Sequence, residues 1–373
     1  MSATSSARRG HYDAIVVGGG HNGIVAAAYL ARAGRSVIVL ERLEHLGGAA
    51  VSAQAFAGVD ARISRYAYLV SLLPDLIVRE LELPVSFVRR RVSSYTPDPR
   101  VGASRGLLLD SADAAATAAS FDSVAGPRAL DGWKTLYETT GRLARAIFPT
   151  LTEPLRSRAE LRALVGDDGV WRALFEEPLG AWLARALPDD LLRGVALTDA
   201  LIGTHAAAGD EALLQNRCFL YHVIGRGRGE WLVPAGGMGT LTSALAGAAE
   251  RAGAELLTRA EVLAIEPASD AARVRLTDHG EALELSATHV LAGVAPVELE
   301  RLLGTAPTER PEGSQLKVNV LLSRLPRLRD AAVAPERAFA GTFHVNETAA
   351  QLQRAYEQAC AGTIPEEVPC EFY

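Results

Sequence analysis

The first forty residues contain a strand, a glycine-rich turn, a helix and a second strand in direct succession. Residues 14–17 form a short apolar, β-branched run, which is typical of a strand buried on both faces. The turn G-G-G-H-N-G at 18–23 follows, and the alanine-rich stretch 24–33 has high helix propensity. Residues 37–40 form the next apolar run. This order predicts a right-handed βαβ unit and therefore a parallel α/β sheet.

The glycine spacing in this turn indicates a dinucleotide site. Gly18 permits the tight turn, Gly20 lets a diphosphate approach the backbone, and Gly23 lets the helix pack close to the sheet. The free N–H groups and positive dipole at the helix N-terminus favour phosphate. Glu41 ends the second strand, where its carboxylate can accept hydrogen bonds from ribose hydroxyls. A purely structural turn is the alternative, but it does not explain the acidic residue Glu41 at the end of the second strand.

Composition excludes several classes of partner. The formal net charge of -6 argues against a basic nucleic-acid-binding face. Glycines interrupt the longest uncharged runs, 14–31 and 231–249, so we expect no transmembrane segment, although peripheral membrane contact remains open. The alanine- and arginine-rich composition resembles that of bacterial proteins and predicts a cytoplasmic location, or the mitochondrial matrix if the chain is eukaryotic.

The cysteines and histidines suggest no metal or dithiol centre. Cys218, Cys360 and Cys370 are far apart, and the eight histidines show no metal-ligand spacing. We therefore predict no disulfide framework and no metal site. His205 and His222 are better explained as structural hydrogen-bonding residues, so no catalytic residue is assigned.

A second glycine pair distinguishes between cofactors. Gly47-Gly48 begins six residues after Glu41 and can fold the chain back over a cofactor's diphosphate and ribityl chain, which favours FAD over NAD. A plain loop is the alternative. Residues 12–23, with Glu41-Arg42 and 47–52, resemble the phytoene-dehydrogenase-like flavoproteins. Within them, these residues are most similar to the branch of pyridine nucleotide-disulphide oxidoreductase domain-containing protein 2.

This resemblance implies a fold and a reaction class. The implied fold is α/β: a Rossmann-like FAD-binding domain with a parallel sheet, into which a largely helical α+β substrate domain is inserted. The implied activity is FAD-dependent oxidation of a small molecule. Hydride would pass from an apolar, isoprenoid-like substrate to flavin N5, and a quinone, oxygen or another acceptor would reoxidise the flavin. Because the cofactor carries this chemistry, no catalytic dyad is required in the sequence.

The resemblance also implies domain boundaries. They are a disordered leader at 1–11, FAD-binding parts at 12–95 and 231–304, and substrate-domain parts at 96–230 and 305–373. A glycine loop at 230–239 leads into a helix at 240–252, which we expect to return the chain to the cofactor domain. Alternating residues at 274–276 and 283–285 predict an antiparallel ribbon, and residues 315–322 predict a strand of the substrate domain. Residues 289–296 resemble the family's strand that ends beside the cofactor, and Trp133, Trp171 and Trp182 are expected to be core residues. We find no further glycine-rich strand–helix segment after Pro296, so we expect the C-terminal flavin segment to be missing and FAD binding to be weak or to need a partner chain.

The site residues follow from the two glycine motifs and the resemblance. The predicted cofactor-binding residues are Gly18, Gly19, Gly20, His21, Asn22, Gly23, Glu41, Arg42, Gly47, Gly48, Ala49 and, through a main-chain contact with adenine that only the resemblance implies, Val262. Three alternatives remain open: a non-catalytic lipid-binding or regulatory protein on the same fold, a truncated inactive form, and an NAD-dependent dehydrogenase. The oligomeric state is not assigned.

Overall fold

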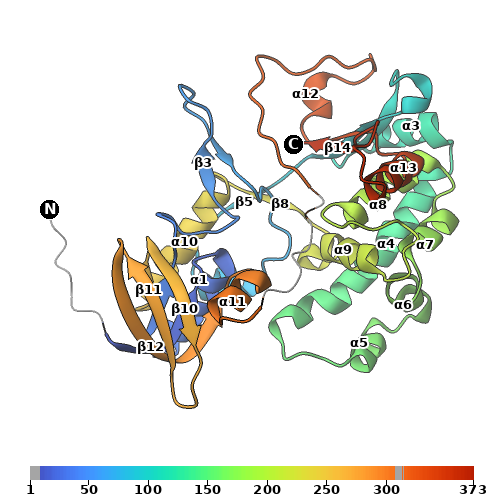
Figure 1. The fold of residues 1–373 in the computed structure, drawn as a ribbon. Helices are drawn as coiled ribbons and strands as arrows, with labels where there is room; N and C mark the ends of the chain where they lie inside the picture. Colours follow the sequence, from blue (N-terminus) through green and yellow to red (C-terminus); the bar gives the residue numbers. More distant parts are fainter. Residues whose placement is uncertain (1–8, 307–312, 314) are drawn as a thin grey trace. The chain divides into compact units, whose positions relative to one another are not determined.

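The computed structural model describes residues 9–306, 313 and 315–373, which fall into two compact units (Figure 1). Unit 1 takes Met1–Leu69, Asp75–Val88 and Val233–Glu312. Unit 2 takes Val70–Pro74, Arg89–Leu232 and Gly313–Tyr373. Most of the predicted leader, 1–8, lies outside the described residues. The chain therefore leaves unit 1 and returns to it, as an inserted domain requires.

Unit 1 is built on a six-stranded sheet in the order β10-β11-β12-β1-β2-β9. The bounds are β1 His11–Val17, β2 Val37–Leu40, β9 Glu255–Leu257, β10 Ala260–Glu266, β11 Ala272–Asp278 and β12 Glu281–Ala292. β1 pairs in parallel with β2 and β12, and β2 pairs in parallel with β9. The carboxyl ends of these four strands therefore meet at one edge. The chain runs outward from β1 to β2 and later returns to β12 on its other side, which makes the edge beside β1 a topological switch point.

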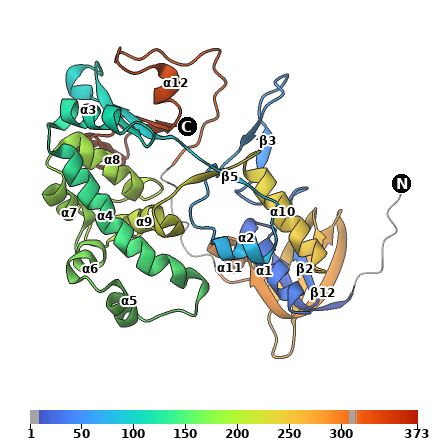
Figure 2. The ribbon, with the colours of Figure 1, turned by 180° about the vertical axis from the view of Figure 1, so that it is seen from behind.

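Two long helices cover one face of this sheet. α1 (His21–Arg32) contacts β1 and β2, and α10 (Met238–Arg251) contacts β9. The two helices lie side by side in front of the sheet in Figure 2. Gly23 makes the close approach of α1 possible, because a Cβ there would lie 2.5 Å from the Gly18 carbonyl oxygen. The predicted helices and strands of this region are confirmed, with boundaries shifted by a few residues.

The antiparallel part of the sheet, β10 to β12, curves over the opposite face of the parallel strands and packs against it. β10, β11 and β12 pair antiparallel, which confirms the ribbon predicted from the alternating pattern. Ile15 and Ile38 from the parallel strands share one core with Val274 and Leu285 from the ribbon. The remaining elements of unit 1 and of its borders are β3 Ser52–Gln54, β4 Arg62–Ser64, α2 Asp75–Glu80, β5 Phe87–Arg89, β8 Leu232–Pro234 and α11 Pro296–Leu302.

Unit 2 is mainly helical. Its helices are α3 Ala114–Ala125, α4 Ala129–Ile147, α5 Arg158–Val165, α6 Asp168–Phe175, α7 Leu179–Ala186, α8 Asp190–Leu201, α9 Leu214–Val223, α12 Pro335–Ala338 and α13 Ala349–Cys360. Short 3₁₀ turns lie at Pro99–Val101, Phe148–Thr152 and Gly225–Gly227. Trp133, Leu136 and Phe219 belong to the apolar core that joins these helices. This packing agrees with the predicted role of tryptophans as core residues.

A four-stranded sheet completes unit 2 in the order β14-β13-β6-β7. The bounds are β6 Val92–Pro97, β7 Gly106–Asp110, β13 Thr342–Val345 and β14 Cys370–Phe372. The strand predicted at 315–322 is wrong: this alternating apolar segment is not in a strand, and its side chains are largely exposed. Otherwise the predicted fold class is confirmed: a Rossmann-like parallel α/β unit interrupted by a largely helical α+β unit. In the described parts of the chain, no helix has both the length and the apolar character needed to span a bilayer.

Candidate cofactor site

The glycine turn lies at the carboxyl edge of the unit 1 sheet, between the ends of β1 and β12. Gly18 has a φ of 99°, and a Cβ there would lie 2.7 Å from the carbonyl oxygen of Gly293. The N–H of Gly293 donates to the Val17 carbonyl at 2.7 Å, which holds the end of β12 against the turn. Only glycine fits at residue 18, because any side chain would collide with the returning strand.

The N-terminus of α1 is open beyond this turn. Gly20 is the N-cap residue, it makes no side-chain cap hydrogen bond, and the first helical turn contains no acidic side chain. The first three N–H groups of a helix have no acceptor within the helix. A Cβ built on Gly20 would meet no atom within 4 Å. The structure therefore offers free N–H donors beside an open space, the combination that a phosphate group needs.

Glu41 lies beside this open end and is only 8% exposed. Its Oε2 accepts a hydrogen bond from the Gly19 N–H at 2.8 Å, and its Oε1 accepts one from the Leu43 N–H at 2.9 Å. A carboxylate has about four lone-pair sites, so two hydrogen bonds leave acceptor capacity for hydroxyl groups. The acid therefore points toward the glycine turn, as predicted, and also stabilises it.

The second glycine pair packs directly on the first turn. The Gly47 N–H donates to the Gly19 carbonyl at 2.8 Å, and Gly47 forms an isolated bridge with Gly20. A Cβ built on Gly48 would lie 3.1 Å from the Gly20 Cα. This placement agrees with a chain that folds back over the diphosphate position, and it argues against an unrelated surface loop.

The other predicted residues lie around this turn and are more exposed than Glu41 and Gly47. Asn22, Arg42 and Ala49 are exposed. Partial burial lowers the pKa of His21, while a hydrogen bond with the Gly47 backbone acts in the opposite direction. We therefore expect the attraction for an anion to come mainly from the helix N–H groups rather than from an imidazolium charge.

Val262 lies on β10 with its side chain buried in the core. A backbone hydrogen bond connects its strand to the site: the N–H of Ala260, two residues before Val262, donates to the Glu41 carbonyl at 2.9 Å. Sequence reasoning did not assign Gly293, although the strand that leads to it resembled the family's cofactor-adjacent strand. Gly293 reaches the turn because β1 pairs in parallel with β12, and a local sequence motif cannot predict this pairing.

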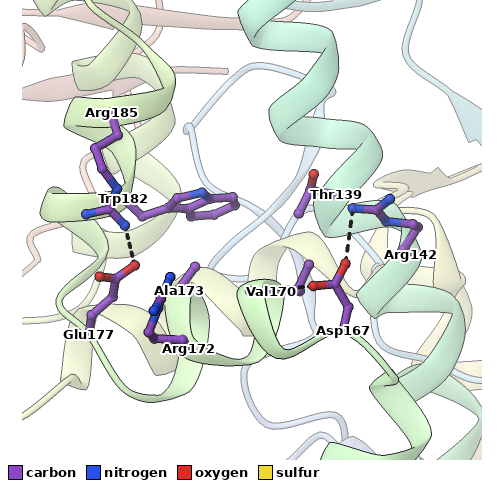
Figure 3. A pocket seen from close by; sticks show the side chains of 10 residues that line it. Thr139, Arg142, Asp167, Val170, Arg172, Ala173, Glu177, Trp182 and Arg185 are labelled. Carbon is purple, nitrogen blue, oxygen red and sulfur yellow. Dashed lines mark hydrogen bonds and ion pairs between the residues drawn. The ribbon is translucent and has the colours of Figure 1, made fainter.

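The helical unit has a separate open pocket of about 310 Å³ (Figure 3). Trp182 lies across it, and two ion pairs, Arg142 with Asp167 and Arg185 with Glu177, border it. None of the predicted cofactor residues lines this pocket. Its arginines are mostly neutralised by the carboxylates, so it is a weaker candidate for an anionic ligand than the helix N-terminus in unit 1.

We expect Glu41→Ala to lower the free energy of unfolding by about 1–3 kcal/mol, because the buried Gly19 N–H loses its acceptor. Urea denaturation measures this loss. Glu44→Ala is the matched control, since Glu44 is 69% exposed and pairs with Arg259 at the surface. Equal stability of the two variants would show that Glu41 does not hold the turn.

Comparisons with known proteins agree with this geometry. Residues 16–73 match the NAD(P)-binding Rossmann-like domain family. An uncharacterised protein of Mycobacterium tuberculosis is 49% identical over 370 residues, which cover 97% of this chain and 69% of that protein. Pyridine nucleotide-disulfide oxidoreductase domain-containing protein 2 of Rattus norvegicus is 31% identical over 419 residues, which cover 99% of this chain and 70% of that protein.

A solved structure shares the fold. Wild-type putrescine oxidase bound to putrescine aligns with a TM-score of 0.53 and 20% identity, over 80% of this chain and 61% of that one. The chain thus spans about 70% of the length of its sequence relatives and less than two thirds of this structural neighbour. By its sequence similarity over nearly all of its own length, the chain belongs to the family of pyridine nucleotide-disulfide oxidoreductase domain-containing protein 2.

Proposed function

We propose that the protein is an FAD-dependent oxidoreductase and that its cofactor binds at the switch point of unit 1. The observation that carries this proposal is the open, uncapped N-terminus of α1 at Gly20, with the Glu41 carboxylate beside it. The free helix N–H groups would hold the diphosphate, and Glu41 would accept hydrogen bonds from the adenosine ribose. The Val262 main chain would lie at the adenine.

Gly47 and Gly48 favour FAD over a nicotinamide cofactor as the occupant. This second glycine pair packs on the first turn, so the backbone of residues 47–49 can follow a diphosphate toward the ribityl chain. The structural neighbour putrescine oxidase shares the fold, while its substrate belongs to that protein.

When bound, the flavin supplies a two-electron acceptor for hydride at N5. The residues of this chain contribute binding and orientation: Gly20 leaves room for the diphosphate, and Glu41 sets the position of the ribose. We further propose an apolar, isoprenoid-like substrate, which rests on the likeness of residues 12–52 to phytoene-dehydrogenase-like flavoproteins.

Equilibrium titration of the purified chain with FAD and, separately, with NAD tests the cofactor assignment. We expect saturable quenching of flavin fluorescence and an affinity for FAD at least about tenfold above that for NAD, equal to about 1.4 kcal/mol. Mass analysis of any cofactor extracted from the purified protein provides an independent check. Tighter binding of NAD would indicate a nicotinamide dehydrogenase, and binding of neither would contradict the assignment of this site to FAD.

A further inference from the structure

A buried cluster of three metal-ligating side chains lies in unit 2. His344 is on β13, Glu371 is on β14, and Glu347 lies in the turn between β13 and α13. His344 and Glu371 are direct cross-strand partners, so their side chains leave the same face of the sheet. Strand pairing thus brings Glu371 to His344 and Glu347, which lie close together earlier in the sequence.

The three side chains are close enough to share one ion. One nitrogen or oxygen atom from each residue lies within 4.8 Å of the other two. His344 Nε2 is 4.0 Å from Glu371 Oε1, and His344 Nδ1 is 3.5 Å from Glu347 Oε2. Ligands that bind an ion at 2.0–2.2 Å lie about 3.5 Å apart in tetrahedral geometry. Because the two carboxylates face different ring nitrogens, the Glu347 side chain would rotate toward Nε2 for all three groups to bind one ion.

Two hydroxyl groups orient the cluster from outside. Thr96 Oγ1 is 2.9 Å from His344 Nδ1, which leaves Nε2, the nitrogen facing Glu371, for a ligand. The Thr198 hydroxyl donates to Glu347 Oε2 at 2.8 Å. Metal-binding histidines and carboxylates are generally held in place by such outer hydrogen bonds.

Burial makes the negative charge of this cluster costly. The side chains of His344, Glu347 and Glu371 are only 6%, 4% and 11% exposed. Two buried carboxyl groups this close together need either a cation between them or a proton.

We propose that His344, Glu347 and Glu371 bind a divalent transition-metal ion of the Zn²⁺ type. One imidazole nitrogen and two carboxylates suit Zn²⁺ better than Mg²⁺, which prefers an all-oxygen shell and keeps several waters. The ion would neutralise the two glutamates and tie β14 to β13 and to the start of α13. The three side chains would fill three of its four tetrahedral positions. This proposal differs from the expectation of no metal, which rested on motif spacing alone.

Zinc titration of chelator-treated protein tests the proposal, with bound metal counted by elemental mass spectrometry and stability followed by thermal denaturation. We expect one equivalent of Zn²⁺ to bind and to raise the melting temperature. Glu371→Gln and Glu347→Gln keep the side-chain shape, so they should fold, and each should weaken Zn²⁺ binding at least about tenfold. Mg²⁺ should produce no comparable shift.

His205→Gln is the matched control. His205 Nε2 lies 3.9 Å from the exposed Cys360 thiol in the same unit, so this pair is the rival zinc site. The control should keep one equivalent at the affinity of the parent protein. Loss of zinc in His205→Gln but not in Glu371→Gln would overturn the proposal. So would the absence of zinc binding to the parent protein; glutamine variants more stable than the parent would then indicate that the glutamates share a proton instead of an ion.

Discussion

Gly20→Val should weaken FAD binding at least about 100-fold, or about 2.8 kcal/mol, while the protein stays folded. The backbone of Gly20 is extended, with φ -68° and ψ 162°, a conformation that valine adopts readily. A Cβ there meets no protein atom within 4 Å, so the new side chain would occupy only the space proposed for the diphosphate. The cost to the free energy of unfolding should stay near 1 kcal/mol, because valine is a poorer N-cap residue than glycine.

Flavin fluorescence titration and urea denaturation of the same preparation measure the two effects of Gly20→Val. Gly10→Val is the matched control: a Cβ there also meets no atom within 4 Å, and Gly10 lies just before β1, in the same unit but outside the glycine turn. It should bind FAD like the parent protein. If Gly20→Val also bound FAD like the parent, the diphosphate could not lie at the start of α1.

Gly194→Ala should destabilise the protein by about 3 kcal/mol, the opposite of its usual effect in a helix. Replacement of a helical glycine by alanine ordinarily stabilises by about 1 kcal/mol. Gly194 lies inside α8, where a Cβ would come 2.7 Å from the Thr348 backbone and even closer to the Glu347 carbonyl oxygen. Backbone atoms cannot rotate away as side chains do, so α8 and the start of α13 would have to separate.

Thermal and urea denaturation compare this variant with Gly141→Ala in α4. A Cβ on Gly141 would meet only the Arg145 guanidinium at 3.5 Å, an ordinary contact with a flexible group. That variant should gain about 0.5–1 kcal/mol. If both variants gained stability, the close packing of α8 on the turn that carries Glu347 would be contradicted.

The part of the cofactor site that sequence reasoning predicted is local. Gly18, Gly23 and Glu41 lie within one βαβ unit, where turn geometry, helix spacing and strand length decide every position. The structure places all three as expected and adds that Glu41 holds the turn through the Gly19 N–H. The use of these residues for FAD stays a prediction, as do the domain boundaries.

Alternating patterns were less reliable than the glycine motif. The ribbon of β11 and β12 was predicted correctly, because a neighbouring strand pairs with each alternating run. The segment 315–322 has a similar alternation, yet it is not in a strand, and Leu316 and Val318 remain exposed. An alternating sequence specifies two faces, whereas a strand also needs a hydrogen-bonding partner that the pattern does not supply.

The amino-acid sequence alone determined the βαβ start, the glycine turn and the acid at the end of β2, because these depend on interactions between residues close together in the chain. Only the tertiary structure decided that Gly293 closes against Gly18 and that His344 faces Glu371. Both contacts are made by strand pairing, and register is set by the packing of the whole sheet rather than by either strand.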